Sequence, residues 1–414
     1  MDILRIATAG SVDDGKSTLI GRLLYDTRSV PKDKLDAIDA ASKRRGVDFL
    51  DLSLLTDGLI AEREQGITID VAHVYFSTPT RKYIIADTPG HFEYTRNMVT
   101  GASTAEVSVI LIDARNGIVE QTARHYAIAC MLRIPHVIVC VNKMDLLSYD
   151  HARFDNIVAQ FRTQFTALKP AAQRLDFLPA SSLHGENVTR SSPHMPWYTG
   201  PTLLEMLEVA ESHQPRHFAA RMQVQTVIRP RTDALHDFRG YAGRISSGTF
   251  AVGDEILVLP NERRTRITRI QRFGADIERA KAGDSVTILL ADDIDISRGS
   301  TFCTSDAAPD ARRELRARIC WLDRTPLENG KTYVLQHGIQ RMRAKLAHLE
   351  SILDVVAQTE SANPAALKLN EIGIASLRLA QPVYADVYAD VPTNGAFILI
   401  DEWSNTTAGV GFVL

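Results

Sequence analysis

The chain carries, near its N-terminus, the stretch Gly10-Ser11-Val12-Asp13-Asp14-Gly15-Lys16-Ser17. It matches the phosphate-binding pattern G-x-x-x-x-G-K-[ST] at every fixed position. The apolar run 4–9 before it predicts a short buried strand, and residues 18–24 after it have the apolar spacing of a helix. A strand, a glycine-rich turn and a helix N-terminus point several backbone N–H groups at one spot, which binds phosphate oxygens. The sequence therefore predicts a P-loop nucleotide-binding domain.

The phosphate-binding loop assigns roles to two side chains. Lys16 is expected to reach the β- and γ-phosphates, and the Ser17 hydroxyl is expected to ligate Mg²⁺. Backbone groups around them complete the predicted phosphate site. Its residues are Gly10, Ser11, Val12, Asp13, Asp14, Gly15, Lys16, Ser17 and Thr18.

Two further segments fit a nucleoside triphosphate. The sequence Asp87-Thr88-Pro89-Gly90-His91 follows the apolar run 83–86, so its aspartate ends a buried strand and is placed to hold the Mg²⁺ shell through water. The Gly90 N–H can contact a γ-phosphate. Upstream, the loop 64–69 offers the Thr68 hydroxyl to Mg²⁺ and γ-phosphate together, a contact that hydrolysis would release. The predicted Mg²⁺ ligands are Ser17, Thr68 and Asp87.

The base is predicted to be guanine. Asn142-Lys143-Met144-Asp145 closes the strand-like run 136–141, and an aspartate at this position pairs with the N1–H and exocyclic amine of guanine, a donor pair that adenine lacks. Ser181-Ser182-Leu183 follows the run 177–180 and is expected to lie against the guanine carbonyl. GTP with Mg²⁺ is therefore the predicted ligand.

These five segments together resemble the translation-factor class of GTPases. The resemblance implies that His91 orients the attacking water, which makes His91, Lys16 and Thr68 the expected catalytic residues. It also implies that Val12 and Ile67 screen that water.

Composition narrows the functional class. The chain has 47 Lys and Arg against 50 Asp and Glu, a net charge of −3, whereas a protein that works mainly on nucleic acid more often carries a basic surplus. No apolar run approaches the length of a membrane span. The four cysteines show no C-x-x-C spacing, which favours a reducing, cytoplasmic compartment over disulfides or a metal site.

The pattern along the 414 residues predicts three domains. Residues 1–212 alternate strand-like and helix-like segments, as in an α/β P-loop domain with a mostly parallel, doubly wound sheet. Within it, the charged stretch 31–63 is interpreted as a mobile first switch with short helices. Residues 213–307 and 308–414 show short strands between turns, typical of two small β-barrels. Trp321 and Trp403 are expected in barrel core.

Longer stretches resemble a narrower family, the large GTP-binding subunits of bacterial sulfate adenylyltransferase (ATP sulfurylase). They are residues 57–71, 94–103, 195–205, 237–243 and 293–299. Three positions depart from that family's pattern. They are the pair Phe92-Glu93 in the second switch, and Ser182, where alanine is usual.

This resemblance implies that two subunits have separate roles in the reaction. A separate small subunit would carry the ATP and sulfate site and make adenosine 5′-phosphosulfate and diphosphate. The present chain would couple GTP hydrolysis to that reaction, in a heterodimer or higher assembly. Some relatives are fused to an adenylylsulfate kinase, which needs a P-loop of its own, and no second G-x-x-x-x-G-K-[ST] occurs in this sequence.

Two alternatives stay open at this point. An elongation-factor-like translation GTPase that binds tRNA or the ribosome would have the same two barrels, although the acidic balance argues against nucleic acid as a partner. A scaffold with a purely structural nucleotide would not need Thr68, Asp87 and His91.

Overall fold

The computed structural model describes residues 2–44, 50–55, 70–91, 95–165, 168, 170, 173–211, 218–230 and 238–414. The chain divides into two compact units. The first comprises residues 1–214 with 354–359, and the second comprises residues 215–353 with 360–414.

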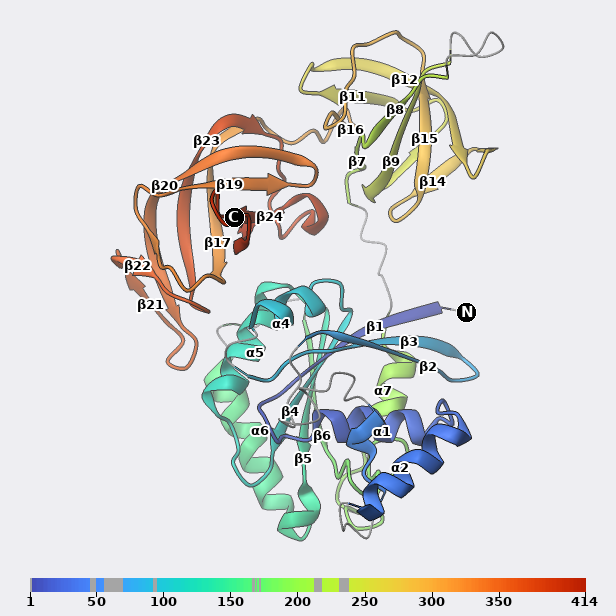
Figure 1. Ribbon diagram of the computed structural model, residues 1–414, viewed down its shortest axis with the longest axis vertical. Coiled ribbons are helices and arrows are strands. Elements are labelled where there is room, and N and C mark those ends of the chain that lie inside the picture. The colour runs from blue at the N-terminus through green and yellow to red at the C-terminus, as the bar shows by residue number, and fades with distance from the viewer. Residues whose placement is uncertain are drawn as a thin grey trace. The chain divides into compact units, whose positions relative to one another are not determined.

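The first unit is built on a six-stranded sheet with the order β2-β3-β1-β4-β5-β6 (Figure 1). All neighbouring pairs are parallel except β2 with β3. Every residue of β4 and β5 is buried, as expected for central strands covered on both faces. The strands are β1 (Asp2–Ala9), β2 (Ala72–Ser77), β3 (Arg81–Asp87), β4 (Val107–Asp113), β5 (His136–Asn142) and β6 (Arg174–Pro179). The predicted doubly wound, mostly parallel sheet is confirmed.

Helices cover both faces of this sheet. One face is covered by α1 and α7, and the other by α4, α5 and α6 (Figure 1). The helices are α1 (Lys16–Asp26), α2 (Lys32–Arg44), α4 (Thr95–Ala102), α5 (Glu120–Met131), α6 (His151–Phe165) and α7 (Leu203–Val209), with 3₁₀ turns η1 (Leu52–Leu55) and η3 (Met144–Leu147). The stretch predicted to hold only short helices contains the 13-residue α2. Its run of alanine, lysine and aspartate without glycine or proline allows this length.

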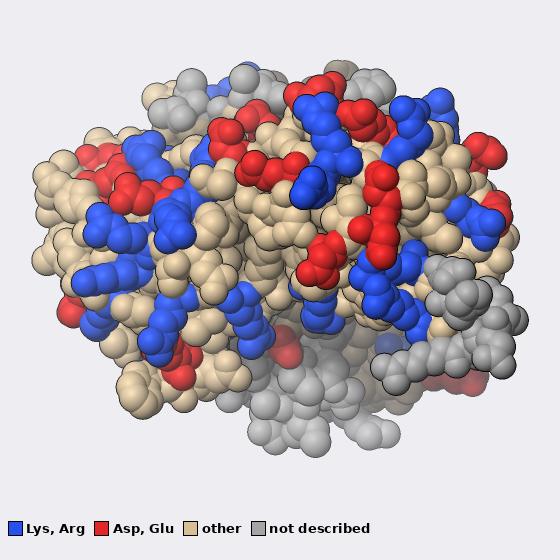
Figure 2. Space-filling view, turned by 90° about the horizontal axis from the view of Figure 1, so that it is seen from above, with Lys and Arg blue, Asp and Glu red and all other residues tan. Residues whose placement is uncertain are grey.

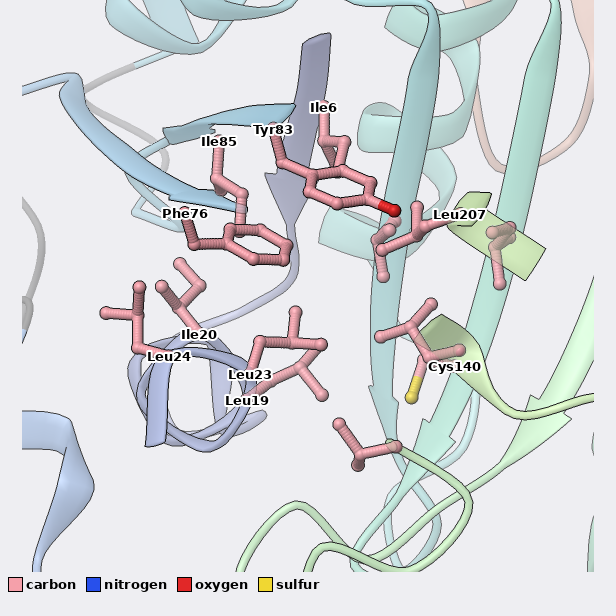
Figure 3. Packing of buried hydrophobic residues seen from close by; sticks show 14 of the residues in the cluster. Ile6, Leu19, Ile20, Leu23, Leu24, Phe76, Tyr83, Ile85, Cys140 and Leu207 are labelled. Atoms are coloured by element: carbon pink, nitrogen blue, oxygen red, sulfur yellow. The ribbon is translucent and has the colours of Figure 1, made fainter. Parts of the chain in front are cut away.

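The apolar face of α1 fixes the helix on the sheet. Leu19, Ile20, Leu23 and Leu24 point from the helix towards strands β1, β2 and β3, where Phe76 and Tyr83 are among the side chains that receive them (Figure 3). The two aromatic rings are stacked, with centroids 4.4 Å apart. Each buried aliphatic side chain contributes about 1.5–3 kcal/mol. This packing holds the N-terminus of α1 in place behind the glycine-rich loop.

The second unit contains two closed six-stranded rings. The first follows the order β11-β16-β7-β9-β15-β12, and the pairing of β11 with β12 closes it. The second follows β19-β24-β25-β17-β23-β20, closed by β19 with β20. The first ring is made of β7 (Arg221–Gln223), β9 (Gly240–Ser247), β11 (Glu255–Leu259), β12 (Arg263–Arg272), β15 (Ser285–Leu290) and β16 (Thr301–Thr304). The second is made of β17 (Arg312–Trp321), β19 (Thr332–His337), β20 (Gln340–Asp354), β23 (Ile372–Val383), β24 (Ala396–Ile400) and β25 (Thr407–Val413). The predicted pair of β-barrels is confirmed.

Short strands outside the two rings extend the sheets or pair with each other. They are β8 (Thr226–Ile228), β10 (Thr249–Ala251), β13 (Ala275–Ile277), β14 (Arg279–Lys281), β18 (Leu327–Glu328), β21 (Thr359–Ala362) and β22 (Ala366–Leu367).

The two tryptophans named from the sequence have opposite environments. Trp321 is fully buried in the second barrel and its indole N–H donates to the Thr325 carbonyl at 2.8 Å. Trp403 is 94% exposed, so its assignment to the core was wrong. The reason is that Trp403 lies in the turn between β24 and β25, held there by the Asp401 carboxylate, which accepts the backbone N–H groups of residues 403 and 404.

Within the second unit, a buried ion pair joins the two barrels. Arg221 of β7 is almost fully buried, and its Nε and Nη2 each donate to the Asp386 carboxylate at 2.9 Å. Asn394 donates to the same carboxylate at 2.7 Å. A bidentate, hydrogen-bonded pair of this kind fixes a specific geometry where the two barrels meet.

The surface charges are mixed. Basic and acidic side chains are interspersed over the face seen in Figure 2, in keeping with the net charge of −3. Among the described residues, no helix combines the length and the apolar character that crossing a membrane requires.

Candidate nucleotide-binding site

The glycine-rich loop runs from the end of β1 into α1, as the sequence predicts. Asp13 and Gly15 adopt φ angles of 69° and 95°, and Gly15 is the N-cap residue of α1. No described side chain caps the N-terminus of this helix, so its first N–H groups remain available for an anion. Gly15 also approaches Asn142 closely, because a Cβ there would lie 2.5 Å from the Asn142 amide nitrogen. Both the backbone conformation and the space therefore require glycine.

Lys16 lies in the centre of the loop. Its ammonium donates to the carbonyls of Gly10 at 2.8 Å and Ser11 at 3.1 Å, and the residue is only 7% exposed. Burial lowers the pKa of Lys16, while nearby carboxylates, led by Asp87 and Asp14, oppose that shift. The ammonium is thus positioned over the space that the loop encloses, where phosphate oxygens can take over its hydrogen bonds.

The segment from Asp87 to His91 packs directly against this loop. Parallel pairing of β1 with β3 aligns Thr8 with Asp87, and the Thr8 hydroxyl donates to the buried Asp87 carboxylate at 3.3 Å. A Cβ on Gly90 would lie 2.2 Å from the Gly10 carbonyl oxygen and 2.5 Å from Lys16 Nζ. Gly90 is therefore in contact with the phosphate-binding loop, and any side chain there would displace it. His91 follows at the exposed end of the segment.

Asn142 connects three of the predicted loops. Its side-chain amide donates to the Asp14 carbonyl at 2.8 Å, and its amide oxygen accepts both the N–H and the hydroxyl of Ser182, at 2.9 and 2.8 Å. The side chain is fully buried. Asn142 therefore fixes the guanine-side loop relative to the phosphate-binding loop, a role that its place in an N-K-x-D pattern does not reveal.

An ion pair orients the next residue of that pattern. Lys143 has a φ angle of 63°, and its ammonium lies 3.0 Å from Asp113 Oδ2, at the end of the neighbouring strand β4. Burial would raise the pKa of Asp113, but hydrogen bonds from Arg115 and Lys143 bring the pKa down to about 2. Asp113 is therefore ionised at neutral pH and holds Lys143 in place. Asp145 lies within the turn η3 and is partly exposed.

Arg22 is a site residue that the sequence did not indicate. It lies on α1, and its guanidinium donates to the carbonyls of Ser182, at 3.2 Å, and Leu183. It thereby anchors the last predicted loop to the helix that begins at Lys16. The contact joins residues 160 positions apart, so no local pattern could have indicated it.

The described part of the chain brings most of the predicted residues together. The loop 10–18, Asp87 to Gly90, Asn142, Lys143 and Ser182 are linked by the contacts above. Ser181 is buried, and its hydroxyl has no hydrogen-bond partner among the described residues. Thr68, Ile67, Phe92 and Glu93 lie outside the described residues, so their predicted roles stay predictions.

The donors present fit Mg²⁺. Ser17 lies in the first turn of α1 and Asp87 ends β3, which offers one hydroxyl and one carboxylate beside the phosphate-binding loop. Mg²⁺ in phosphate sites is typically held by one or two such groups, together with phosphate oxygens and water. The described residues contain no cluster of three His, Cys, Asp or Glu that could hold a metal ion.

Comparison with known families decides the class of this site. Residues 1–216 match the model of the elongation factor Tu GTP-binding domain. The chain belongs to this family of GTPases. Residues 241–303 match elongation factor Tu domain 2, and residues 314–414 match the GTP-eEF1A C-terminal domain-like family. The resemblance to the translation-factor class of GTPases is thereby confirmed.

Relatives and solved structures match this chain over its whole length. Two proteins from Mycobacterium tuberculosis strains, each called "Bifunctional enzyme CysN/CysC", are 48% identical over all 414 residues. The chain covers 67% of their length. This match confirms the narrower family resemblance as well. The Saccharomyces cerevisiae Ski7 GTPase-like domain, solved with GTP and with GDP and inorganic phosphate, is 18% identical, with TM-scores of 0.54 and 0.55 over 100% of this chain and 97% of Ski7. At that identity, it shows the shared fold alone.

A buried histidine behind the site leads to a pH prediction. His125 of α5 is 3% exposed, and burial, with repulsion from Lys16 and Arg124, lowers its pKa to about 3. The unfolded chain binds a proton near pH 6.5 and the folded chain does not, so this residue makes stability fall as pH decreases from 6.5 towards 3, by about 1.4 kcal/mol per pH unit. His125→Leu is expected to remove that part of the slope.

The measurement is the melting temperature of wild type and His125→Leu between pH 7 and pH 4.5. The difference between the two melting temperatures at each pH separates the contribution of His125 to stability from that of carboxylates such as Asp113. Parallel curves for the two proteins would show that His125 is protonated without penalty in the folded chain.

Proposed function

We propose that this chain is the GTP-binding subunit of a sulfate adenylyltransferase. It binds and hydrolyses GTP, and a partner catalytic subunit makes adenosine 5′-phosphosulfate and diphosphate from ATP and sulfate in sulfate assimilation. The observation that carries this proposal is the 48% identity to CysN/CysC over the full chain, together with the linked loops of the nucleotide site. The partner, the ATP that it binds and the heterodimer are parts of the proposal.

The arrangement of this chain's residues supports a GTPase mechanism. Lys16 offers its ammonium to the β- and γ-phosphates, and the N-terminus of α1 adds backbone N–H groups. Ser17 and Asp87, with Thr68, would hold Mg²⁺, which offsets charge on the transferring phosphoryl group. His91, at the exposed end of the Asp87 segment, orients water for in-line attack, and Asp145 selects guanine.

The position of Gly90 supports coupling to a partner. There is no room for a side chain between Gly90 and the Gly10 carbonyl or Lys16 Nζ, and α4 follows after a few residues. A γ-phosphate near Lys16 is therefore expected to alter this close packing, and its release to alter it again. A change of this kind between two states is how GTPases of known mechanism signal to partners. We further propose a cytoplasmic location, which is supported by four buried cysteines that form no disulfide.

The test is synthesis of adenosine 5′-phosphosulfate by the chain purified with its catalytic subunit. We expect GTP to stimulate product formation, and GDP or a non-hydrolysable GTP analogue to fail. His91→Ala is expected to lower GTP hydrolysis by about 10²–10⁴-fold and to abolish the stimulation. His151→Ala, which removes a half-exposed histidine of α6, is the matched control.

Two results would overturn the proposal. One is product formation that does not respond to GTP. The other is GTP hydrolysis that responds instead to ribosomes or tRNA, which would place the protein with the translation GTPases, whose domain families it shares.

A further inference from the structure

The first barrel displays a phenylalanine at the tip of a hairpin. Strands β12 and β13 pair up to Arg272 and Ala275, so Phe273 and Gly274 form a two-residue turn. Their φ angles are 50° and 80°, both positive, as in a type I′ turn. Phe273 is 93% exposed. The large apolar ring therefore contributes almost nothing to the folded core.

The backbone at this tip is also unfavourable for phenylalanine. A type I′ turn strongly prefers Asn-Gly, because asparagine tolerates the left-handed region, whereas a bulky side chain at positive φ is an outlier. Neither burial nor turn geometry thus explains Phe273. Strained and exposed residues of this kind are concentrated at functional sites.

Strand β12, which leads to this tip, is rich in exposed arginines. Its inward residues Thr265, Ile267 and Ile270 are buried. Its other positions include five arginines, all exposed, and no lysine or acidic residue. They are Arg263, Arg264, Arg266, Arg269 and Arg272. Arginine and aromatic residues are enriched at protein interfaces and lysine is depleted, so this composition differs from that of a merely solubilising face.

Carboxylates lie among these arginines. Arg264 pairs with Glu255 at 3.0 Å, and Arg272 with Asp284 at 3.1 Å. The Arg272 guanidinium also lies 5.4 Å from the centre of the Phe273 ring. The interleaved carboxylates would repel a nucleic-acid backbone, whereas guanidinium groups with unused donors can still pair with carboxylates of a protein.

We propose that Phe273 and the exposed arginines of β12 form the docking site for the catalytic subunit. This assignment rests on the function proposed above. Phe273 inserts into an apolar pocket of that subunit, and the arginines around it pair with acidic residues at the pocket's rim. A buried aromatic anchor surrounded by charge pairs is the usual organisation of a strong protein interface.

The test measures both the folding stability of one variant and its affinity for the catalytic subunit. Phe273→Asn gives the turn the residue it prefers, so the melting temperature is expected to stay equal or rise. The dissociation constant for the purified catalytic subunit, measured by titration calorimetry, is expected to rise about 10-fold or more. Trp403→Asn is the control, because Trp403 is equally exposed but lies in the other barrel. It is expected to leave the dissociation constant unchanged.

Salt dependence tests the arginines. Arg266 donates within the chain only to the Gly253 carbonyl among the described contacts, so Arg266→Gln leaves the ion pairs intact. Wild-type affinity is expected to weaken as salt is raised, and the variant is expected to show a shallower dependence.

The outcomes separate this inference from the proposed function. If the wild type binds the subunit and Phe273→Asn binds equally well, or if Trp403→Asn weakens binding as much, the docking site is wrong while the proposed function stands. If the wild type does not bind the subunit and GTP does not stimulate synthesis, the proposed function fails. Binding of tRNA that depends on Phe273 would assign the surface to nucleic acid and overturn the inference.

Discussion

Lys16→Met is expected to lower kcat for GTP hydrolysis by about 10²–10³-fold and to weaken GTP binding. The ammonium is the positive charge that the loop holds at its centre, bonded at 2.8 Å to the Gly10 carbonyl. Methionine matches its length but offers neither charge nor donor to the phosphates. Single-turnover hydrolysis at saturating GTP separates the loss in chemistry from the loss in binding.

Two further variants sharpen that experiment. Lys82→Met removes an exposed lysine from β3 and is expected to leave hydrolysis unchanged. Lys16→Arg keeps the charge, yet we expect it to fail as well. Gly90 lies so close to Lys16 Nζ that the larger guanidinium has no room beside it. Wild-type turnover in Lys16→Met would contradict the assignment of this site.

Asn142→Ala is expected to produce the second large effect, a loss of both stability and nucleotide affinity. It leaves the Asp14 carbonyl and the two donors of Ser182 without partners inside the domain. Each orphaned buried group costs about 1–3 kcal/mol, so we expect a loss of roughly 2–5 kcal/mol in unfolding free energy where the groups relax together. Affinity for GDP should fall by about 10²-fold or more, because that loss acts on the loops that enclose the nucleotide.

Ser182→Ala provides the graded comparison. It removes only the hydroxyl bond to Asn142 and keeps the backbone bond, so we expect a loss of about 0.5–1.5 kcal/mol. Thermal melts with and without GDP, and titration of a fluorescent GDP analogue, measure both quantities. Equal effects of Asn142→Ala and Ser182→Ala would show that Asn142 does not connect the loops.

Much of the fold could be predicted from local pattern. The continuous apolar runs that became β4 and β5 predict strands buried on both faces, and the apolar spacing after Lys16 predicts α1. The residues at which strands begin and end were harder to predict. Residues 221–228 form two strands, β7 and β8. Strand β7 pairs with both β16 and β9, whereas β8 pairs with β9, and such a change of neighbours at a barrel corner leaves no local pattern. Trp403 shows the same limit, since hydrophobicity alone does not distinguish a core position from a displayed one.

What the sequence by itself determined is the chemistry of the site. A phosphate-binding loop and an Asp-Thr-Pro-Gly-His segment act through the backbone and side chains of a few consecutive residues. They can therefore be recognised from the local sequence. Only the tertiary structure decided what holds these segments together. Arg22 anchors the loop of Ser182, Asp113 orients Lys143, and Asn142 bonds to Asp14 across 128 positions. The physical reason is that parallel strands bring their carboxyl ends to one edge of the sheet whatever their separation in sequence, and the contacts made there depend on strand order and register.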